Sequence, residues 1–232
     1  MAVGPQPLAH AAGCGAGDVT ARAVVTALVL WMVAEAYALD ADLEAYRRAA
    51  AGGAVGTITG RAYAERRTPG EAEQPLVETV VTLLPRSAEI MARLEKIKAG
   101  ARASQRDFLG SATAIRHVRE AYELALWEAG FPELVRTTVV DGTGAFAFTD
   151  LPAGEWMLIA VRSVFVNKAS PRATPRERQV YTPRLRLIGY DAVSVWLGEL
   201  TVSRGRSEAV ELVDRSVWFT GVVEERVLDA GP

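Results

Sequence analysis

The sequence predicts a mainly β protein: an antiparallel β-sandwich of about seven strands that carries an inserted α-helical hairpin. Three observations predict this fold. Short runs with period-two alternation are separated by turn residues, one stretch at 87–133 changes to a helical period, and the strand–helix–strand repeat of a parallel sheet is missing. The chain has 232 residues, half of them hydrophobic, which is enough to bury a core.

The first strands are expected between residues 54 and 84. Residues 54–63 place glycines on both sides of Ile58, and residues 76–84 alternate well enough to form a half-buried strand that Pro85 ends. Residues 39–53 come before them and end in a glycine pair. We expect this lead-in segment to be a short polar helix or a frayed end.

The helical period begins at Ser87. The first helix carries an apolar stripe at i, i+4 and i+7, formed by Ile90, Leu94 and Ile97. Ser104 and Asp107 form a candidate capping box for a second helix, which ends near residue 130. The short link predicts an antiparallel hairpin, which either packs on the sandwich or presents a face to another chain. If the hairpin is only an insert, a chain without residues 87–133 should still fold.

Strand patterns return after the helices. Residues 134–139 alternate, a tight turn follows at 141–144, and Phe146 and Phe148 then point the same way. A second turn at 151–154 leads into a strand that is predicted to place three residues on one face: Trp156, Leu158 and Ala160. Farther on, residues 193–202 and 209–213 predict a final hairpin, and residues 217–223 predict one more strand.

Composition excludes several classes of function. The formal net charge of −2 removes the basic face that nucleic-acid binders need. Cys14 is the single cysteine, and His10 and His117 are the two histidines. His117 shares a helix face with two acids, Glu120 and Glu123, but a metal site needs three or four ligands. We therefore expect no catalytic residues, no metal site and no cofactor.

The N-terminus resembles an export signal. Residues 23–34 read AVVTALVLWMVA without a charge, Arg22 stands before them, and Ala-Tyr-Ala closes the run at residue 38. The run is shorter than the roughly 20 residues of a membrane-spanning helix. Residues 1–38 are predicted to be a cleaved signal peptide, and the protein to be secreted or periplasmic. A buried core helix and an uncleaved anchor are the alternatives, and such an anchor would be the chain's attachment to a membrane.

Two stretches resemble the carboxypeptidase regulatory-like domain. The first runs from Gly56-Thr-Ile58-Thr-Gly60 to Leu83. The second, residues 138–158, contains the pattern D-x-x-G-x-F-x-F, then L-P-x-G-x-W-x-L. The resemblance implies a transthyretin-like, carbohydrate-binding-like sandwich over residues 54–224, interrupted at 87–133 and followed by a tail at 225–232. Such domains usually bind, space or stabilise, and are not catalytic.

A long basic loop is predicted at residues 162–186. It holds seven bases and one acid, Glu177, a local charge of +6. It is either a solvated connection or a clamp for an anionic glycan, head group or protein patch. Its candidate partner-binding residues are Arg172, Arg176, Arg178, Arg184 and Tyr181.

Sugar binding would require exposed aromatic rings. The strand residues Trp156, Trp196 and Trp218 are predicted to lie in the core, and Trp127, Tyr181 and Tyr190 are the surface candidates. The sequence therefore predicts an exported, non-catalytic binding or structural module with weak carbohydrate binding, whose partner is an unknown protein or glycan. The alternative is an interaction or assembly factor that uses the helical hairpin or the basic loop.

Overall fold

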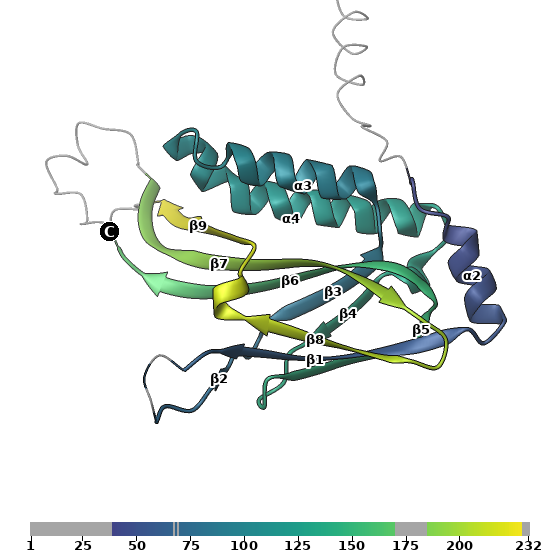
Figure 1. Ribbon diagram of the computed structural model, residues 1–232. Helices are drawn as coiled ribbons and strands as arrows, with labels where there is room; N and C mark the ends of the chain where they lie inside the picture. The colour runs from purple at the N-terminus through teal and green to yellow at the C-terminus, as the bar shows by residue number, and fades with distance from the viewer. Residues whose placement is uncertain (1–38, 67, 69, 170–184, 229–232) are drawn as a thin grey trace, which may run out of the picture. The chain divides into compact units, whose positions relative to one another are not determined.

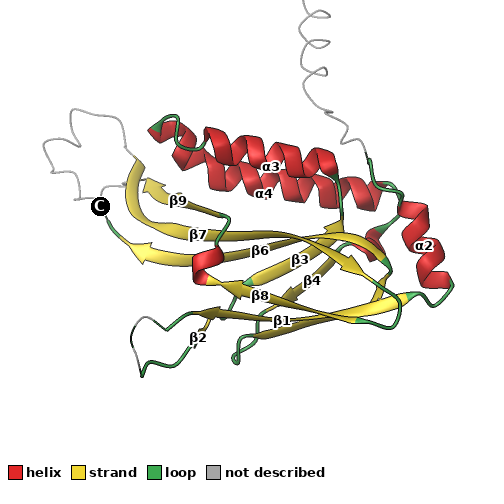
Figure 2. Ribbon diagram, viewed as in Figure 1, coloured by secondary structure: helices red, strands yellow, loops and turns green. Residues whose placement is uncertain are grey.

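The computed structural model describes residues 39–66, 68, 70–169 and 185–228. These residues form a mainly antiparallel β-sandwich with helices packed on it, which confirms the predicted fold class (Figures 1 and 2). Two sheets face each other, and a helical hairpin lies over the outer face of one of them. Within the described part of the chain, no helix is long and apolar enough to cross a membrane.

The small sheet is built around β1 (Val55–Ala64). On one side β1 pairs antiparallel with β5 (Ala145–Pro152) and, at its end, with the two-residue β2 (Gln74–Pro75). On the other side β1 pairs with β8 (Ser207–Val213), and this pairing is parallel. Strand β1 therefore lies beside β8, a strand from much later in the chain.

The large sheet has the order β4-β3-β6-β7-β9, and all its neighbours are antiparallel. Its strands are β4 (Arg136–Val139), β3 (Val80–Pro85), β6 (Gly154–Asn167), β7 (Leu185–Val202) and β9 (Phe219–Leu228). Strand β9 includes the first four residues of the segment 225–232, which the sequence suggested as a tail.

Two strand predictions need correction. The strand expected at 76–84 begins only at Val80, because Thr79 Oγ1 donates to the Leu76 carbonyl at 2.7 Å and closes a turn. The prediction of a final hairpin is wrong, because β7 and β8 belong to different sheets. The turn between β7 and β8 binds to β1 instead, because the Gly205 amide donates to the Val55 carbonyl at 2.7 Å.

The basic loop is also shorter than expected. Strands β6 and β7 remain in register from Gly154–Val202 to Asn167–Gly189, so residues 162–167 and 185–186 lie in strands. Arg162, which was placed in the loop, donates from Nε to the Val77 carbonyl at 3.4 Å. Strand β6 is long because it pairs continuously with β7, and the local sequence carries no signal of that pairing.

The core between the sheets is aromatic and aliphatic. Trp156, Leu158 and Ala160 are buried on one face of β6, and Phe146 and Phe148 face them from β5 with ring centroids 6.3 Å apart, both as predicted. The Phe146 ring lies on Gly60, where a Cβ would come within 2.0 Å of the ring. Only glycine fits at that position.

The helical hairpin consists of α3 (Ala88–Gly100) and α4 (Gln105–Glu128), and it packs on the sandwich. Ser104 caps α4 by accepting from the Asp107 amide at 3.1 Å, but its own hydroxyl donates to the Asp107 carboxylate, so only half of the capping box forms. Under the hairpin, Met157 and Ile159 of β6 are fully buried. Strand β6 is therefore covered on both faces.

The lead-in segment forms helix α2 (Leu43–Ala51), and part of it joins the core. The Tyr46 ring meets the Trp156 ring edge-on at 5.3 Å, and its hydroxyl donates to the Glu155 carbonyl. Just before α2, the Asp40 carboxylate accepts from the first amides of α3, Ala88 N at 2.8 Å and Glu89 N at 3.2 Å. Two short 3-10 helices, Pro132–Leu134 and Asp214–Ser216, complete the described elements.

Candidate functional site

The predicted partner-binding residues Arg172, Arg176, Arg178, Arg184 and Tyr181 lie outside the described residues. They belong to the segment 170–184, which connects the ends of β6 and β7. Their role stays a prediction from the sequence.

The aromatic candidates separate only in part as the alternation suggested. Trp156 and Trp196 are buried in the core. Trp218, just before β9, is half-buried and donates from Nε1 to Glu95 Oε1 of α3 at 2.8 Å, so it is less enclosed than predicted. Trp127 is 62% exposed near the end of α4, and Tyr190 is half-buried in β7. These rings are on different elements and do not form a common platform.

The acids beside His117 do not gather into a site. His117 Nδ1 lies 3.5 Å from Glu120 Oε2 on the helix surface, while Glu123 pairs with Arg119. Among the described residues, no three His, Cys, Asp or Glu side chains are placed to hold a metal ion.

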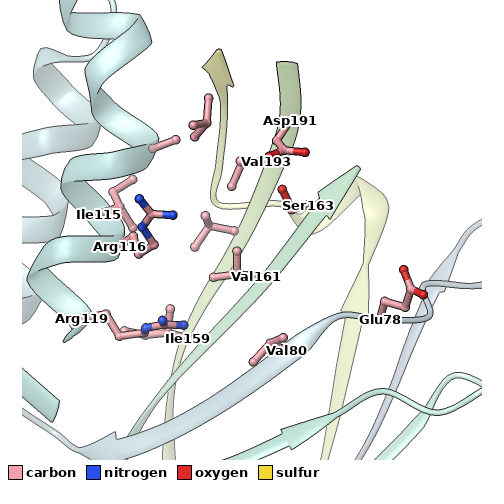
Figure 3. A pocket seen from close by; sticks show the side chains of 13 residues that line it. Glu78, Val80, Ile115, Arg116, Arg119, Ile159, Val161, Ser163, Asp191 and Val193 are labelled. Atoms are coloured by element: carbon pink, nitrogen blue, oxygen red, sulfur yellow. The ribbon is translucent and has the colours of Figure 1, made fainter. Parts of the chain in front are cut away.

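A groove of about 390 Å³ lies between α4 and the outer face of the large sheet (Figure 3). Its floor is aliphatic and crosses four neighbouring strands, and α4 forms the opposite wall. The floor residues are Val80, Ile159, Val161, Val193, Val195 and Val223.

Small side chains leave this space open. Helix α4 approaches β9 closely at Ala112, where a Cβ on Gly221 would lie 3.1 Å from the Ala112 Cβ. One turn farther along α4, Ile115 faces a floor made largely of valines. The groove therefore opens beside a close contact between helix and sheet.

Arg119 is the unusual residue of the α4 wall. It occupies the sheet-facing position between Ile115 and Tyr122, where the neighbouring residues of the stripe are buried, and its side chain is only 17% exposed. Its Nε lies 3.1 Å from Glu123 Oε1. Burial raises the pKa of the Glu123 carboxyl, and the Arg119 charge partly offsets that rise. Arg119 was not predicted as a site residue, although a charged residue inside an apolar stripe is a signal in the sequence that could have pointed to this wall.

The second arginine on the wall is more exposed. Arg116 Nε lies 3.8 Å from Glu120 Oε1, one helical turn along α4. Both arginines of the groove thus have a glutamate of their own helix beside them. The Arg116–Glu120 pair is exposed, and salt bridges of this kind on a helix surface are weak and leave the guanidinium free to reorient.

The sheet side of the groove carries the remaining polar groups. Asp191 of β7 and Ser163 of β6 face the groove, and Glu78 lies at its β3 end (Figure 3). Asp191 is half-buried and has no ion pair or hydrogen bond to any other described residue through its side chain. Neither sequence periodicity nor spacing singled out this carboxylate.

The arrangement is suited to binding. Ser163 is the single hydroxyl among the described lining residues, and no histidine lies among them to activate it as a nucleophile. An enclosed aliphatic surface with a few polar groups at its edge is typical of a small-molecule site.

A second hollow, of about 280 Å³, is polar and lies at the other end of the strands. It is lined by Arg86, Glu155, Glu199, Leu200 and Thr201. Arg86 already pairs with Glu199, and it lies 3.8 Å from Glu155. Those charges are satisfied by one another, so this hollow is the weaker candidate.

No family model matches the chain, and no curated protein matches its sequence. Among solved structures, the chain is similar to a candidate carbohydrate-binding protein of Pseudomonas aeruginosa, with 18% identity and a TM-score of 0.36 over 69% of this chain and 88% of that one. It is also similar to the pilus backbone of Streptococcus pneumoniae, with 14% identity and a TM-score of 0.25 over 68% of this chain and 40% of that one.

A third similarity is to the minor pilin of Streptococcus agalactiae, with 9% identity and a TM-score of 0.26 over 76% of this chain and 98% of that one. None of the three similarities assigns the chain to a family or a function. The carboxypeptidase regulatory-like domain stays a resemblance carried by the sequence pattern.

Proposed function

We propose that the chain is an exported, non-catalytic binding module and that the groove between α4 and the large sheet is its ligand site. One observation carries this proposal: the groove of about 390 Å³ has an aliphatic floor from four strands and polar groups at its edge. Small-molecule sites have volumes of roughly 300–1,000 Å³ and this kind of lining. The ligand expected there is a small molecule with a largely aliphatic body.

A sugar is a poorer fit to the groove. Protein sites for sugars use the faces of aromatic rings, and none of the described lining residues is aromatic. The exposed rings Phe108 and Trp127 lie near opposite ends of α4, and Phe165 lies on β6. Weak carbohydrate binding is therefore kept as one arm of the test.

A protein partner is the second candidate function. Leu124 and Trp127 lie one turn apart on α4, and both are more than half exposed. Residues three positions apart share a helix face, so these two form an apolar spot on the outside of the hairpin. An interaction or assembly factor would use this spot, or the basic segment 170–184.

Filling the groove tests the proposal. In the purified full-length chain, Val161→Phe places a ring in the hollow, while Val139→Phe makes the same change at an exposed position of β4. Octanol and simple sugars serve as probes in a thermal-shift assay. A ligand at 100 times its Kd adds about 2.7 kcal/mol of stability. That corresponds to a rise in Tm of roughly 2–4 °C per kcal/mol.

We expect octanol to stabilise the wild type and Val139→Phe but not Val161→Phe. Stabilisation by sugars alone would mean that the ligand site is a carbohydrate site outside the groove. No stabilisation by either probe, or equal stabilisation of both variants, would overturn the groove as the ligand site.

A further inference from the structure

One end of the groove brings together an acid, an aromatic ring and a hydroxyl. Phe165 of β6 is directly opposite Asp191 of β7, and Ser163 is opposite Val193. Directly opposed residues of an antiparallel pair share a face, with Cβ atoms about 4.5–5.5 Å apart. Since Asp191, Ser163 and Val193 all line the groove, Phe165 lies on the same outer face, next to the residues that line this end of the groove.

Asp191 is the groove carboxylate whose charge the described residues leave unbalanced. Arg116 and Arg119 each have a glutamate of α4 within 4 Å, and Glu78 is exposed to water. Asp191 is half-buried beside valines and has no such neighbour among the described residues. A partly desolvated carboxylate without a partner is stabilised by a cation that reaches it.

Phe165 offers a second contact for the same cation. Its ring lies over Gly189, where a Cβ would come within 2.4 Å of the ring, so the absence of a side chain lets the ring lie on the strand. The ring is 50% exposed. An exposed aromatic face attracts ammonium groups through its quadrupole, most strongly where water is partly excluded.

We infer that the ligand of the groove is an aliphatic amine or quaternary ammonium compound, whose positively charged nitrogen binds between Asp191 and Phe165. Its aliphatic part then extends over the valines of β6, β7 and β9. The Ser163 hydroxyl beside Asp191 accepts a hydrogen bond when the nitrogen carries hydrogens. This inference rests on the function proposed above and adds the head group to it.

Three probes with the same alkyl chain test the head group: octylamine, octanol and octanoate. Their affinities are measured by calorimetry on the full-length chain near neutral pH. We expect octylamine to bind about tenfold more tightly than octanol, as one charge-assisted contact with a cation–π contribution would give. Octanoate, which Asp191 repels, should bind most weakly.

Two variants and two controls locate the effect. Asp191→Asn should remove most of the preference for octylamine over octanol, because only the Phe165 ring then still attracts the cation, and Phe165→Leu should reduce the preference while keeping an apolar surface. Asp150→Asn and Phe108→Leu make the same changes at exposed positions outside the groove. Both controls should keep the wild-type preference for octylamine over octanol. Because Asp191 and Phe165 are not in the core, urea unfolding should show all four variants to be folded.

Each outcome decides one of the two proposals. Equal binding of octylamine and octanol by the wild type overturns the inference but leaves the groove as a binding site. Tighter binding of octanoate than of octylamine also overturns the inference. It would mean that the head group is negative and binds Arg116 and Arg119. If none of the three probes binds, the proposed function falls as well.

Discussion

Asp141 shows how one side chain organises the passage between the two sheets. It follows β4 of the large sheet and precedes β5 of the small one. Its Oδ1 accepts from Thr143 Oγ1 at 2.7 Å, Thr143 N at 2.8 Å and Ala145 N at 2.9 Å. These hydrogen bonds, with that from the Thr143 hydroxyl first, lower the pKa of the Asp141 carboxyl below its ordinary value of 3.8.

A pH dependence of stability follows from this lowered pKa. The ionised Asp141 stabilises the fold fully above the ordinary value, and that contribution is lost as the pH falls through the lower pKa of the folded state. Asp141→Asn keeps an accepting oxygen but cannot titrate. We expect its urea midpoint to fall less steeply than that of the wild type as the pH is lowered below the ordinary value of 3.8.

Asp150→Asn is the control for this titration, because Asp150 is exposed and its side chain has no hydrogen bond to another described residue. It should keep the wild-type slope. An unchanged slope in Asp141→Asn would mean that the turn does not depend on the charge.

Neither Arg119 nor Asp191 was predicted from the sequence, but they differ in whether the sequence could have revealed them. Arg119 interrupts the apolar stripe of α4, which a helical projection of residues 105–128 displays. Asp191 belongs to a strand whose start the sequence misplaced by eight residues, at 193 instead of Leu185, so its face could not be assigned. The groove itself depends on the spacing between α4 and the sheet, which no local pattern contains.

At the scale of elements, the helical hairpin is a third layer of the fold. Leu84, Met157 and Ile159 of the large sheet are buried although they alternate with residues that face the small sheet. Their side chains therefore lie on the outer face of the large sheet, where the helical hairpin covers them. The sequence left open whether the hairpin packs on the sandwich, and the structure shows that it does.

Removal of residues 87–133 should therefore destroy the fold. Leaving a large aliphatic side chain exposed forgoes about 1.5–3 kcal/mol, and three such residues exhaust much of a stability of roughly 5–15 kcal/mol. We expect the shortened chain to be insoluble or to unfold without cooperativity in urea. Two glycines inserted between Arg102 and Ala103, at the hairpin tip, control for disturbance of the connection.

The helices and the strands differ in what made them predictable. Helix ends depend on local signals, such as Ser87 and Ser104 at the N-caps, and both helices were located within a few residues. Strand partners depend on distant residues. The turn at Arg204-Gly205 has the composition of a hairpin, yet it crosses the sandwich because β1 offers a partner for β8.

At the scale of the whole molecule, the basic segment 170–184 remains the sequence's main candidate for an anionic partner. Replacing Arg172, Arg176 and Arg178 by serine should lower the salt concentration at which the chain elutes from heparin, because fewer sulfate contacts form. The matched control replaces Lys96, Arg102 and Arg106 of the hairpin by serine, which changes the net charge equally. Equal losses in both triple variants would mean that charge alone, and not this segment, governs retention.

The parallel pair of β1 and β8 governs the order in which the chain can fold. Thr57 pairs with Ser207, 207 − 57 = 150 positions later, so β1 cannot gain its second neighbour until most of the polypeptide is available. Contacts of such long sequence separation slow folding, because the loop must close before the pairing is formed. A chain that completes a sheet only with a late strand stays unfolded longer after synthesis, which would suit the export that we propose for it, because secretion channels pass unfolded chains.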